Sequence, residues 1–241
     1  MAFSSWRGIV GIIKPTMRPG GLEDMIRLLP EGIGVLPLYN NITRGDRAEF
    51  KEVMAEYDEK VAILAEQGCD IIHPEGAPPF MVMGLKGEAR KIRGWERKYK
   101  IPIITSGTNH IAALKALKIK RFVGVTYFSG DINKTFADYF TAAGFECLAM
   151  EGMDVPFNQV QEMSSHRVYQ HVKTAVLKHP KAQGIYMLGS GWKVMDILQT
   201  LEQDLGLPVV HPITARVWEF QKRLHVHEPR QGYGTLLADL P

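Results

Sequence analysis

Short apolar runs alternate with amphipathic stretches along the whole chain, and this alternation constrains the fold more than any other feature. Most runs carry hydrophobic residues at consecutive positions, as parallel strands do when helices cover both faces of their sheet. The runs predicted to be strands are Gly8–Ile13, Gly34–Leu38, Asp70–His73, Pro102–Thr105, Arg121–Thr126, Glu146–Met150, Gly184–Leu188 and Pro208–His211. Strand followed by helix throughout predicts an α/β fold with right-handed crossovers.

Amphipathic helices are predicted between these strands. In Phe50–Gln67 the apolar residues recur at steps of three and four positions, which places them on one helical face. Similar patterns predict helices over Ser164–Lys178 and Lys193–Leu205.

Eight strands are compatible with one closed barrel or with two open four-stranded sheets. An internal echo favours two sheets, because the strand and glycine turn at Gly68–Pro79 resemble those at Gln183–Trp192. We therefore predict two related α/β halves: residues 1–112 with 213–241 form the first, and residues 113–212 form the second. Because ligands of such sheets bind beyond the carboxyl ends of the strands, we expect the site in the cleft between the halves.

Composition and charge narrow the function classes. The 241 residues are 45% hydrophobic and 23% charged, which excludes a disordered or collagen-like chain. A net charge of +3 does not argue for a nucleic-acid partner. No apolar run approaches the roughly 18 residues that span a bilayer, and Met1–Trp6 holds no signal-peptide core, so we expect no membrane partner and a cytoplasmic protein. Cys69 and Cys147 lie outside any CxxC pair and are expected to be free thiols.

Polar residues follow the predicted strands at the edge where a ligand would bind. Each has a structural alternative, because such residues also cap helices, complete turns or form buried hydrogen bonds. The residues that we expect in the site on these grounds are Lys14, Asn40, His73, Glu75, Thr108, His110, Tyr127, Asn133 and His211.

Two glycine-containing turns carry a more specific prediction. Ser106-Gly107-Thr108 and Gly189-Ser190-Gly191 are each expected to open a helix, where free N–H groups and the helix dipole attract anions. Two such turns facing a cleft suit a small carboxylate or dicarboxylate. Neither a GxGxxG fingerprint after the first strand nor a phosphate-binding GxxxxGK[ST] loop occurs, and no spacing suggests a metal site, so we expect no cofactor and no metal.

Several segments also carry a family resemblance. They are Gly68–Gly84 (GCDIIHPEGAPPFMVMG), Val123–Asn133, Gly184–Trp192, Pro208-Val-Val and the tail Gly232-Tyr-Gly-Thr-Leu-Leu. On these segments the chain resembles the aspartate/glutamate racemase superfamily, and within it the branch of arylmalonate decarboxylase and maleate cis-trans isomerase. The resemblance implies two Rossmann-like halves, each with a four-stranded parallel sheet, related by pseudo-twofold symmetry. It also implies an active site between them, no cofactor and a possible homo-oligomer.

The chain departs from this superfamily at its catalytic thiols. Members use one or two cysteines as acid and base, in the turns after the third strand of each half. The corresponding turns here are Glu75-Gly76-Ala77 and Leu188-Gly189-Ser190, which contain no cysteine. The two-thiol racemase reaction is therefore not expected. The groups that could still hold a carboxylate or an enediolate are the backbone at Gly76 and Ala77, the Tyr127 hydroxyl, Asn133 and the amides of Gly189–Gly191.

Proton transfer then needs another group. Glu75 and His211 are the first candidates for general acid/base work, with His73, His110 and Lys14 behind them. Ser190 and His211 could also form a nucleophile–base pair.

Three functions remain open at this point. The first is a cofactor-independent lyase or isomerase acting on a small carboxylate by non-thiol chemistry. The second is a hydrolase that activates water in the same pocket, and the third is a non-catalytic protein that binds small carboxylates. The surplus of titratable groups at the strand ends favours an enzyme over a binding protein, which needs donors only.

Overall fold

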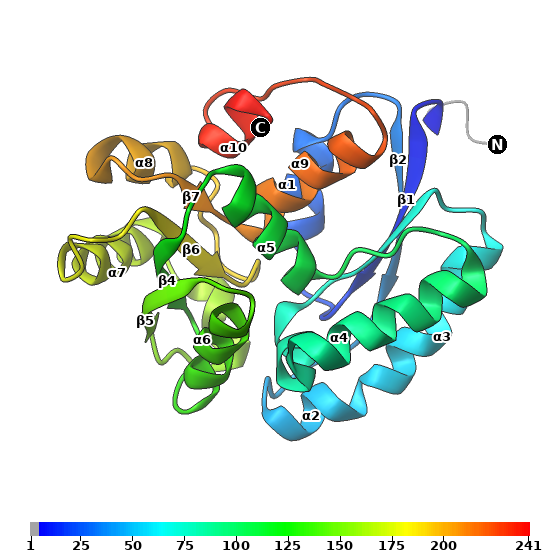
Figure 1. Ribbon diagram of the computed structural model, residues 1–241, viewed down its shortest axis with the longest axis horizontal. Coiled ribbons are helices and arrows are strands. Elements are labelled where there is room, and N and C mark those ends of the chain that lie inside the picture. Colours follow the sequence, from blue (N-terminus) through cyan, green and yellow to red (C-terminus); the bar gives the residue numbers. More distant parts are fainter. Residues whose placement is uncertain (1–4) are drawn as a thin grey trace.

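Two separate parallel sheets form the framework of the molecule (Figure 1). The computed structural model describes residues 5–241. Most of Met1–Trp6, the segment in which no signal-peptide core is expected, lies outside the described residues. The first sheet has the order β2 (Ile33–Tyr39), β1 (Gly8–Lys14), β3 (Ile71–Pro74), and the second has the order β5 (Glu146–Gly152), β4 (Arg121–Thr126), β6 (Gly184–Leu188), β7 (Val209–Val210). All pairings are parallel, which confirms the α/β class and the choice of two sheets.

The predicted strand Pro102–Thr105 is the one correction to the sheets, since the first sheet has three strands rather than four. Ile103 forms only an isolated parallel bridge with Ile72. The Ile72 N–H donates to the Pro102 carbonyl, and the Ile104 N–H donates to the Ile72 carbonyl. The segment occupies the position of a fourth strand but is too short for a ladder, because Pro102 has no N–H and Thr105 already caps the next helix.

The helices lie between the strands as predicted, with two differences in their bounds. They are α1 (Gly21–Leu28), α2 (Arg47–Glu52), α3 (Met54–Glu66), α4 (Ala77–Tyr99), α5 (Ser106–Ala116), α6 (Ile132–Ala142), η2 (Phe157–Glu162), α7 (Ser165–Leu177), α8 (Leu198–Leu205), α9 (Pro212–Arg223) and α10 (Thr235–Asp239). The expected helix over Phe50–Gln67 is divided between α2 and α3. The helix expected from Lys193 begins only at Leu198, so the turn at Gly189–Gly191 does not open a helix.

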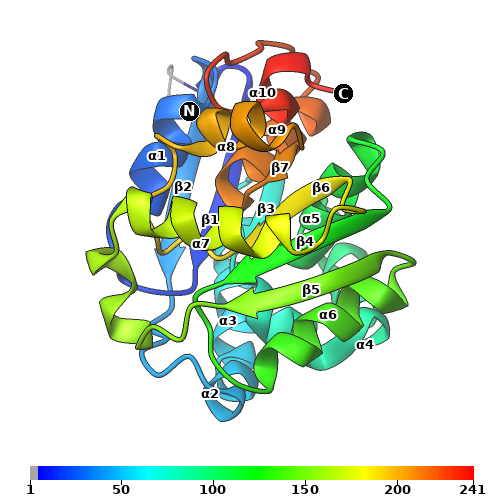
Figure 2. The same ribbon diagram turned by 90° about the vertical axis from the view of Figure 1, so that its left-hand side faces the viewer.

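The arrangement of helices brings the two sheets together around a central region. Helices α7 and α8 lie on the outer side of the second sheet (Figure 2). Helices α5 and α9 pack on each other in the middle of the molecule, and α9 also packs on α1. Helix α4 packs on α6, which joins the halves at a second place. No helix within residues 5–241 is long and apolar enough to cross a membrane.

Candidate active site

A pocket lies where β1, β3 and β6 end, between the two sheets. Its lining comes from the segments after these strands, from the first turns of α5 and α9, and from η2. The sequence-predicted site residues that line it are Lys14, Glu75, Gly76, Ala77, His110, Tyr127, Gly189, Ser190 and Gly191. Parallel strands end at one edge of a sheet, and two such edges face each other here.

Glu75 makes the central polar contacts of the pocket. The Ser190 hydroxyl donates a hydrogen bond to Glu75 Oε1 at 2.9 Å, and Arg216 Nη2 lies 3.1 Å from the same oxygen. Both members of the ion pair are buried. The Tyr57 hydroxyl donates to the Glu75 carbonyl group, which fixes the backbone below the carboxylate. The carboxylate therefore meets a hydroxyl from the second half and a guanidinium from α9.

Two further cations line the same pocket. Lys14 Nζ donates to the Arg18 carbonyl at 2.7 Å, and the Arg18 guanidinium lies over the Phe157 ring at 4.0 Å. Burial lowers the pKa of Lys14, and the charge of Glu75 acts in the opposite direction. With Arg216, three cations face the single carboxylate of Glu75, which gives these four side chains a formal charge of +2. Such a pocket attracts a small dianion.

The two turns that carry the family resemblance have matching backbones. Gly76 is the second residue after β3 and has a φ angle of 106°. Gly189 is the first residue after β6 and has a φ angle of 105°. Most L-residues avoid this region, so glycine is favoured at both positions. At Gly189 an added Cβ would also collide with the Tyr127 ring. Burial raises the pKa of Tyr127 to about 12, so its hydroxyl keeps its proton at neutral pH and acts as a hydrogen-bond donor.

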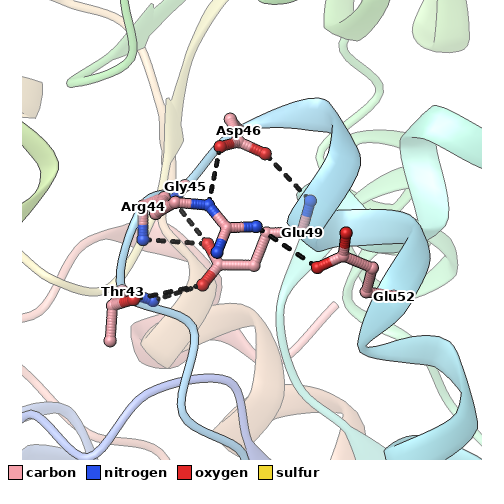
Figure 3. A network of polar contacts seen from close by, with 6 residues as sticks. All are labelled: Thr43, Arg44, Gly45, Asp46, Glu49 and Glu52. Carbon is pink, nitrogen blue, oxygen red and sulfur yellow. Dashed lines mark hydrogen bonds and ion pairs between the residues drawn. The ribbon is translucent and has the colours of Figure 1, made fainter.

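The remaining wall of the pocket is apolar and includes Ile42, Phe50, Phe128 and Phe157. Figure 3 shows how the loop after Ile42 is held: the Glu49 carboxylate accepts hydrogen bonds from the N–H groups of Thr43, Arg44 and Gly45 at 2.8, 2.9 and 2.7 Å.

Gly45 in turn packs closely against the Phe157 ring, the ring on which Arg18 stacks. The charged cluster of Figure 3 therefore holds the loop that lies against Phe157.

His211 does not line the pocket, which corrects the expectation that it stands beside Ser190. Its Nδ1 accepts a hydrogen bond from the Ile213 N–H and so caps α9. Burial, with the nearby Arg216 charge, lowers the pKa of His211 well below its ordinary value, so the ring is neutral at physiological pH. The Ser190 hydroxyl is directed to Glu75 instead of His211, and no nucleophile–base pair forms between them.

Three predicted binding residues have structural roles or positions outside the pocket. Asn133 accepts from the Thr126 hydroxyl at 2.8 Å and donates to the Phe128 carbonyl at 3.0 Å, which ties the turn after β4. Thr108 bonds with Thr105, the residue that caps α5. Asn40 is buried behind the lining. Asn133 and Thr108 therefore fit the alternatives of a turn and a cap, whereas both amide atoms of Asn40 are buried without a hydrogen-bond partner among the described residues.

The other titratable groups near the strand ends include two neutral histidines. His73 is buried beside Ser106 and Phe220, and burial lowers its pKa well below the ordinary value. His110 lines the pocket, and burial followed by the Arg216 charge lowers its pKa to about 3. Within residues 5–241, no group of three or more His, Cys, Asp or Glu side chains is arranged to bind a metal ion.

Neither of the two cysteines lines the pocket, and both are free thiols, as predicted. Burial raises the pKa of Cys69 to about 11 and that of Cys147 to about 12, so both thiols stay protonated at neutral pH. They therefore lack the position and the ionisation that catalytic thiols need.

Sequence reasoning missed Arg216 and Arg18. A usable signal existed for Arg216: it stands in the segment Ile213–Phe220, where nearly every neighbour is apolar, at the start of a helix that follows a strand. An arginine in such a setting is buried only with a partner or beside a ligand. Arg18 gave a weaker signal, because it is one of several residues in the loop that follows Lys14.

Comparison with known proteins finds related sequences and structures. The sequence profile of the arylmalonate decarboxylase family matches residues 30–237. The maleate isomerase of Geobacillus stearothermophilus is 22% identical over 198 residues, covering 80% of this chain and 78% of that protein.

Solved structures show the same fold. The maleate isomerase of Pseudomonas putida superposes with a TM-score of 0.89 at 18% identity and covers 97% of this chain and 99% of its own. A variant of arylmalonate decarboxylase in a liganded form gives 0.87 at 17% identity, with coverage of 97% and 99%. The maleate cis-trans isomerase of Nocardia farcinica, solved with a covalently bound succinylcysteine intermediate, gives 0.84 at 16% identity, with coverage of 96% and 98%.

Proposed function

The chain belongs to the arylmalonate decarboxylase family, and from this membership we propose that it is a cofactor-independent lyase that removes CO₂ from a small dicarboxylate. The observation that carries the proposal is the charge of the pocket. The positive charges of Lys14, Arg18 and Arg216 exceed the negative charge of Glu75 by two. This excess matches a substrate with two ionised carboxyl groups. The apolar wall would receive the rest of the molecule.

The reaction balances without a nucleophile. The bond between the α carbon and one carboxylate breaks, CO₂ leaves, and the bonding electron pair remains on the α carbon as an enediolate. That carbon then takes up one proton. The charge that develops on the enediolate oxygens is stabilised by fixed donors and cations in a buried pocket, where such interactions are strong. Tyr127, which keeps its proton, and the backbone of the Gly189–Gly191 turn are the donors that we assign to these oxygens.

We assign the proton to the couple of Glu75 and Ser190. The Ser190 hydroxyl lies 2.9 Å from Glu75 Oε1 and links this carboxyl group to the turn where the enediolate would be held. The couple would deliver a proton to the α carbon and be protonated again from solvent.

Decarboxylation is favoured over thiol-dependent isomerisation by the position of the sulfur atoms. The related Nocardia isomerase has been solved with a succinylcysteine, a covalent adduct on a thiol. Cys69 and Cys147 lie outside the pocket and stay protonated, so this chain has no thiol to form such an adduct there.

The test is an unbiased analysis of products in deuterium oxide. The purified protein is incubated with a panel of substituted malonates, maleate, hydantoins and cyclic imides, and the mixtures are read by NMR. We expect CO₂ and a monocarboxylate with deuterium at the α carbon from at least one malonate. Conversion of maleate to fumarate without CO₂, or opening of a cyclic imide, would overturn the proposal in favour of an isomerase or a hydrolase.

A further inference from the structure

Arg216 leaves two buried nitrogen atoms without a hydrogen-bond partner. Its Nε donates to the Pro212 carbonyl at 3.0 Å, which fixes the side chain along α9. Nη2 is paired with the Glu75 carboxylate at 3.1 Å but makes no well-directed hydrogen bond to it, and Nη1 has no partner at all among the residues that the structure describes. The side chain is 1% exposed and lines the pocket. Buried guanidinium nitrogens without an acceptor indicate a ligand, because leaving them unpaired is unfavourable.

His110 presents a second unpartnered nitrogen atom from α5. Its Nδ1 lies 2.8 Å from the Tyr186 hydroxyl. Burial raises the pKa of Tyr186 well above its ordinary value, so this hydroxyl keeps its proton. Nδ1 is the only hydrogen-bond partner of that hydroxyl within residues 5–241, so its buried proton is paired only if Nδ1 accepts it.

The proton of the neutral His110 ring is then on Nε2. That atom is buried without a partner, while the ring lines the pocket. His110 therefore offers a neutral N–H donor close to Arg216, whose charge acts on it.

We infer that Arg216 and His110 form a buried subsite that binds one carboxylate of the ligand. The inference rests on the proposed function and deepens it, since it assigns the residues that select an ionised carboxyl group. The charges of the buried side chains support the inference. Lys14 and Arg216 carry two positive charges and Glu75 carries one negative charge, so one additional carboxylate neutralises these three side chains. The guanidinium supplies charge and direction, and His110 Nε2–H supplies a second hydrogen bond without adding charge.

The subsite has a consequence for selectivity. A ligand with an amide in place of this carboxylate would present an N–H group to nitrogen atoms that can only donate. We expect the pocket to discriminate strongly between malonate and malondiamide, because hydrogen bonds to charged groups are stronger than those to neutral ones.

The experiment measures binding and needs no turnover. Isothermal titration calorimetry gives the Kd of malonate, with malondiamide as the neutral reference, for the wild type and for His110→Asn and His110→Gln. Asparagine can place a nitrogen near Nδ1 but not near Nε2, whereas glutamine can place its amide nitrogen near Nε2. We expect His110→Asn to weaken malonate binding by about 10- to 100-fold and His110→Gln to recover most of the loss.

Arg216→Lys provides the second variant, since it keeps the charge and loses the planar fork. We expect at least about tenfold weaker malonate binding. Malonate binding at wild-type strength in both folded His110→Asn and folded Arg216→Lys would overturn the subsite, as would a wild type that does not bind malonate at all. Weakened binding in these variants together with no CO₂ release from any malonate would support the subsite and reject the decarboxylase, so the two proposals fail separately.

Discussion

The Ser190 hydroxyl donates a hydrogen bond to Glu75 Oε1 at 2.9 Å, joining two residues that are 115 positions apart in the chain. Glu75 follows β3, at the edge of the three-stranded sheet, and Ser190 follows β6, an inner strand of the four-stranded sheet. Because Arg216 contacts the same carboxylate oxygen at 3.1 Å, a change at any of the three residues acts on the other two. The first two predictions test this arrangement.

Glu75→Gln is expected to lower kcat by about 10²–10⁴-fold, the usual contribution of a general acid or base. It should also reduce the free energy of unfolding by on the order of 3–5 kcal/mol, because the buried Arg216 charge loses its partner. Steady-state kinetics and urea unfolding measure the two effects. Glu56→Gln is the matched control: this exposed glutamate pairs with Lys60, and its loss should change stability by about 0–1 kcal/mol and leave kcat alone. Wild-type kcat in folded Glu75→Gln would reject the role of Glu75.

Ser190→Ala should lower kcat while leaving the Glu75–Arg216 pair in place. The variant removes one hydrogen bond to a charged acceptor, an interaction of about 1.5–3 kcal/mol, so we expect a loss of roughly 10- to 100-fold in rate. Ser165→Ala removes a comparable bond to the Asp196 carboxylate at an exposed position and should have no effect on rate. Equal rates for the two variants would show that Ser190 has no part in the reaction.

Activity is expected to survive treatment with iodoacetamide at neutral pH. Cys69 and Cys147 lie outside the pocket, and their pKa values of about 11 and about 12 leave little thiolate to react. Turnover is assayed after treatment, and mass spectrometry reports the modified sites. Complete inactivation with a cysteine as the sole modified residue would place a thiol in the reaction after all.

The carboxyl group of Glu88 should make the free energy of unfolding of this protein depend on pH. Its carboxyl group is buried between helices, where it accepts from the Thr105 hydroxyl at 2.6 Å and from the Tyr139 hydroxyl. Burial raises its pKa above the ordinary 4.5, so the folded protein binds this proton more tightly than the unfolded chain does. The resulting stabilisation is present below pH 4.5 and is lost as the pH rises through the folded pKa.

The measurement compares urea unfolding of the wild type and Glu88→Gln from pH 4 upwards. The wild type should lose stability relative to the variant with rising pH, by at most about 1.4 kcal/mol per pH unit. Two parallel stability curves would contradict the prediction. Glu56→Gln, at an exposed site, should run parallel to the wild type over the same range.

Strands β4 and β6 were predictable because they are buried on both faces. Arg121–Thr126 and Gly184–Leu188 have the predicted bounds, and continuous apolar runs identify such strands directly. The strand predicted over Pro102–Thr105 forms only an isolated bridge. Its apolar side chains indicated a strand, but a ladder also needs backbone hydrogen bonds, which Pro102 and the cap at Thr105 limit. Lys193–Ile197 carries a helical pattern but forms a turn, so local periodicity did not decide that segment.

The candidate site was predictable in its backbone and less so in its side chains. Strand ends and glycine turns located Glu75, Gly76, Gly189 and Ser190 in one pocket, since topology alone brings them together. The direction of a side chain depends on tertiary contacts that no spacing reveals. His211 follows a strand as Glu75 does, yet its ring turns back to cap α9. Arg216 lies five residues beyond that cap, and helical geometry rather than strand topology brings it to the pocket.

The placement of Arg216 on α9 has a consequence for biosynthesis. Glu75 is translated 141 residues earlier, and its buried cation does not exist until the ribosome has made α9. A nascent chain that ends before α9 contains the strands of both sheets. It lacks the packing of α9 on α1 and α5. The pocket is therefore complete only after α9 has been synthesised and has folded, and small dicarboxylates should stabilise chains that contain α9 but not ribosome-bound intermediates that lack it.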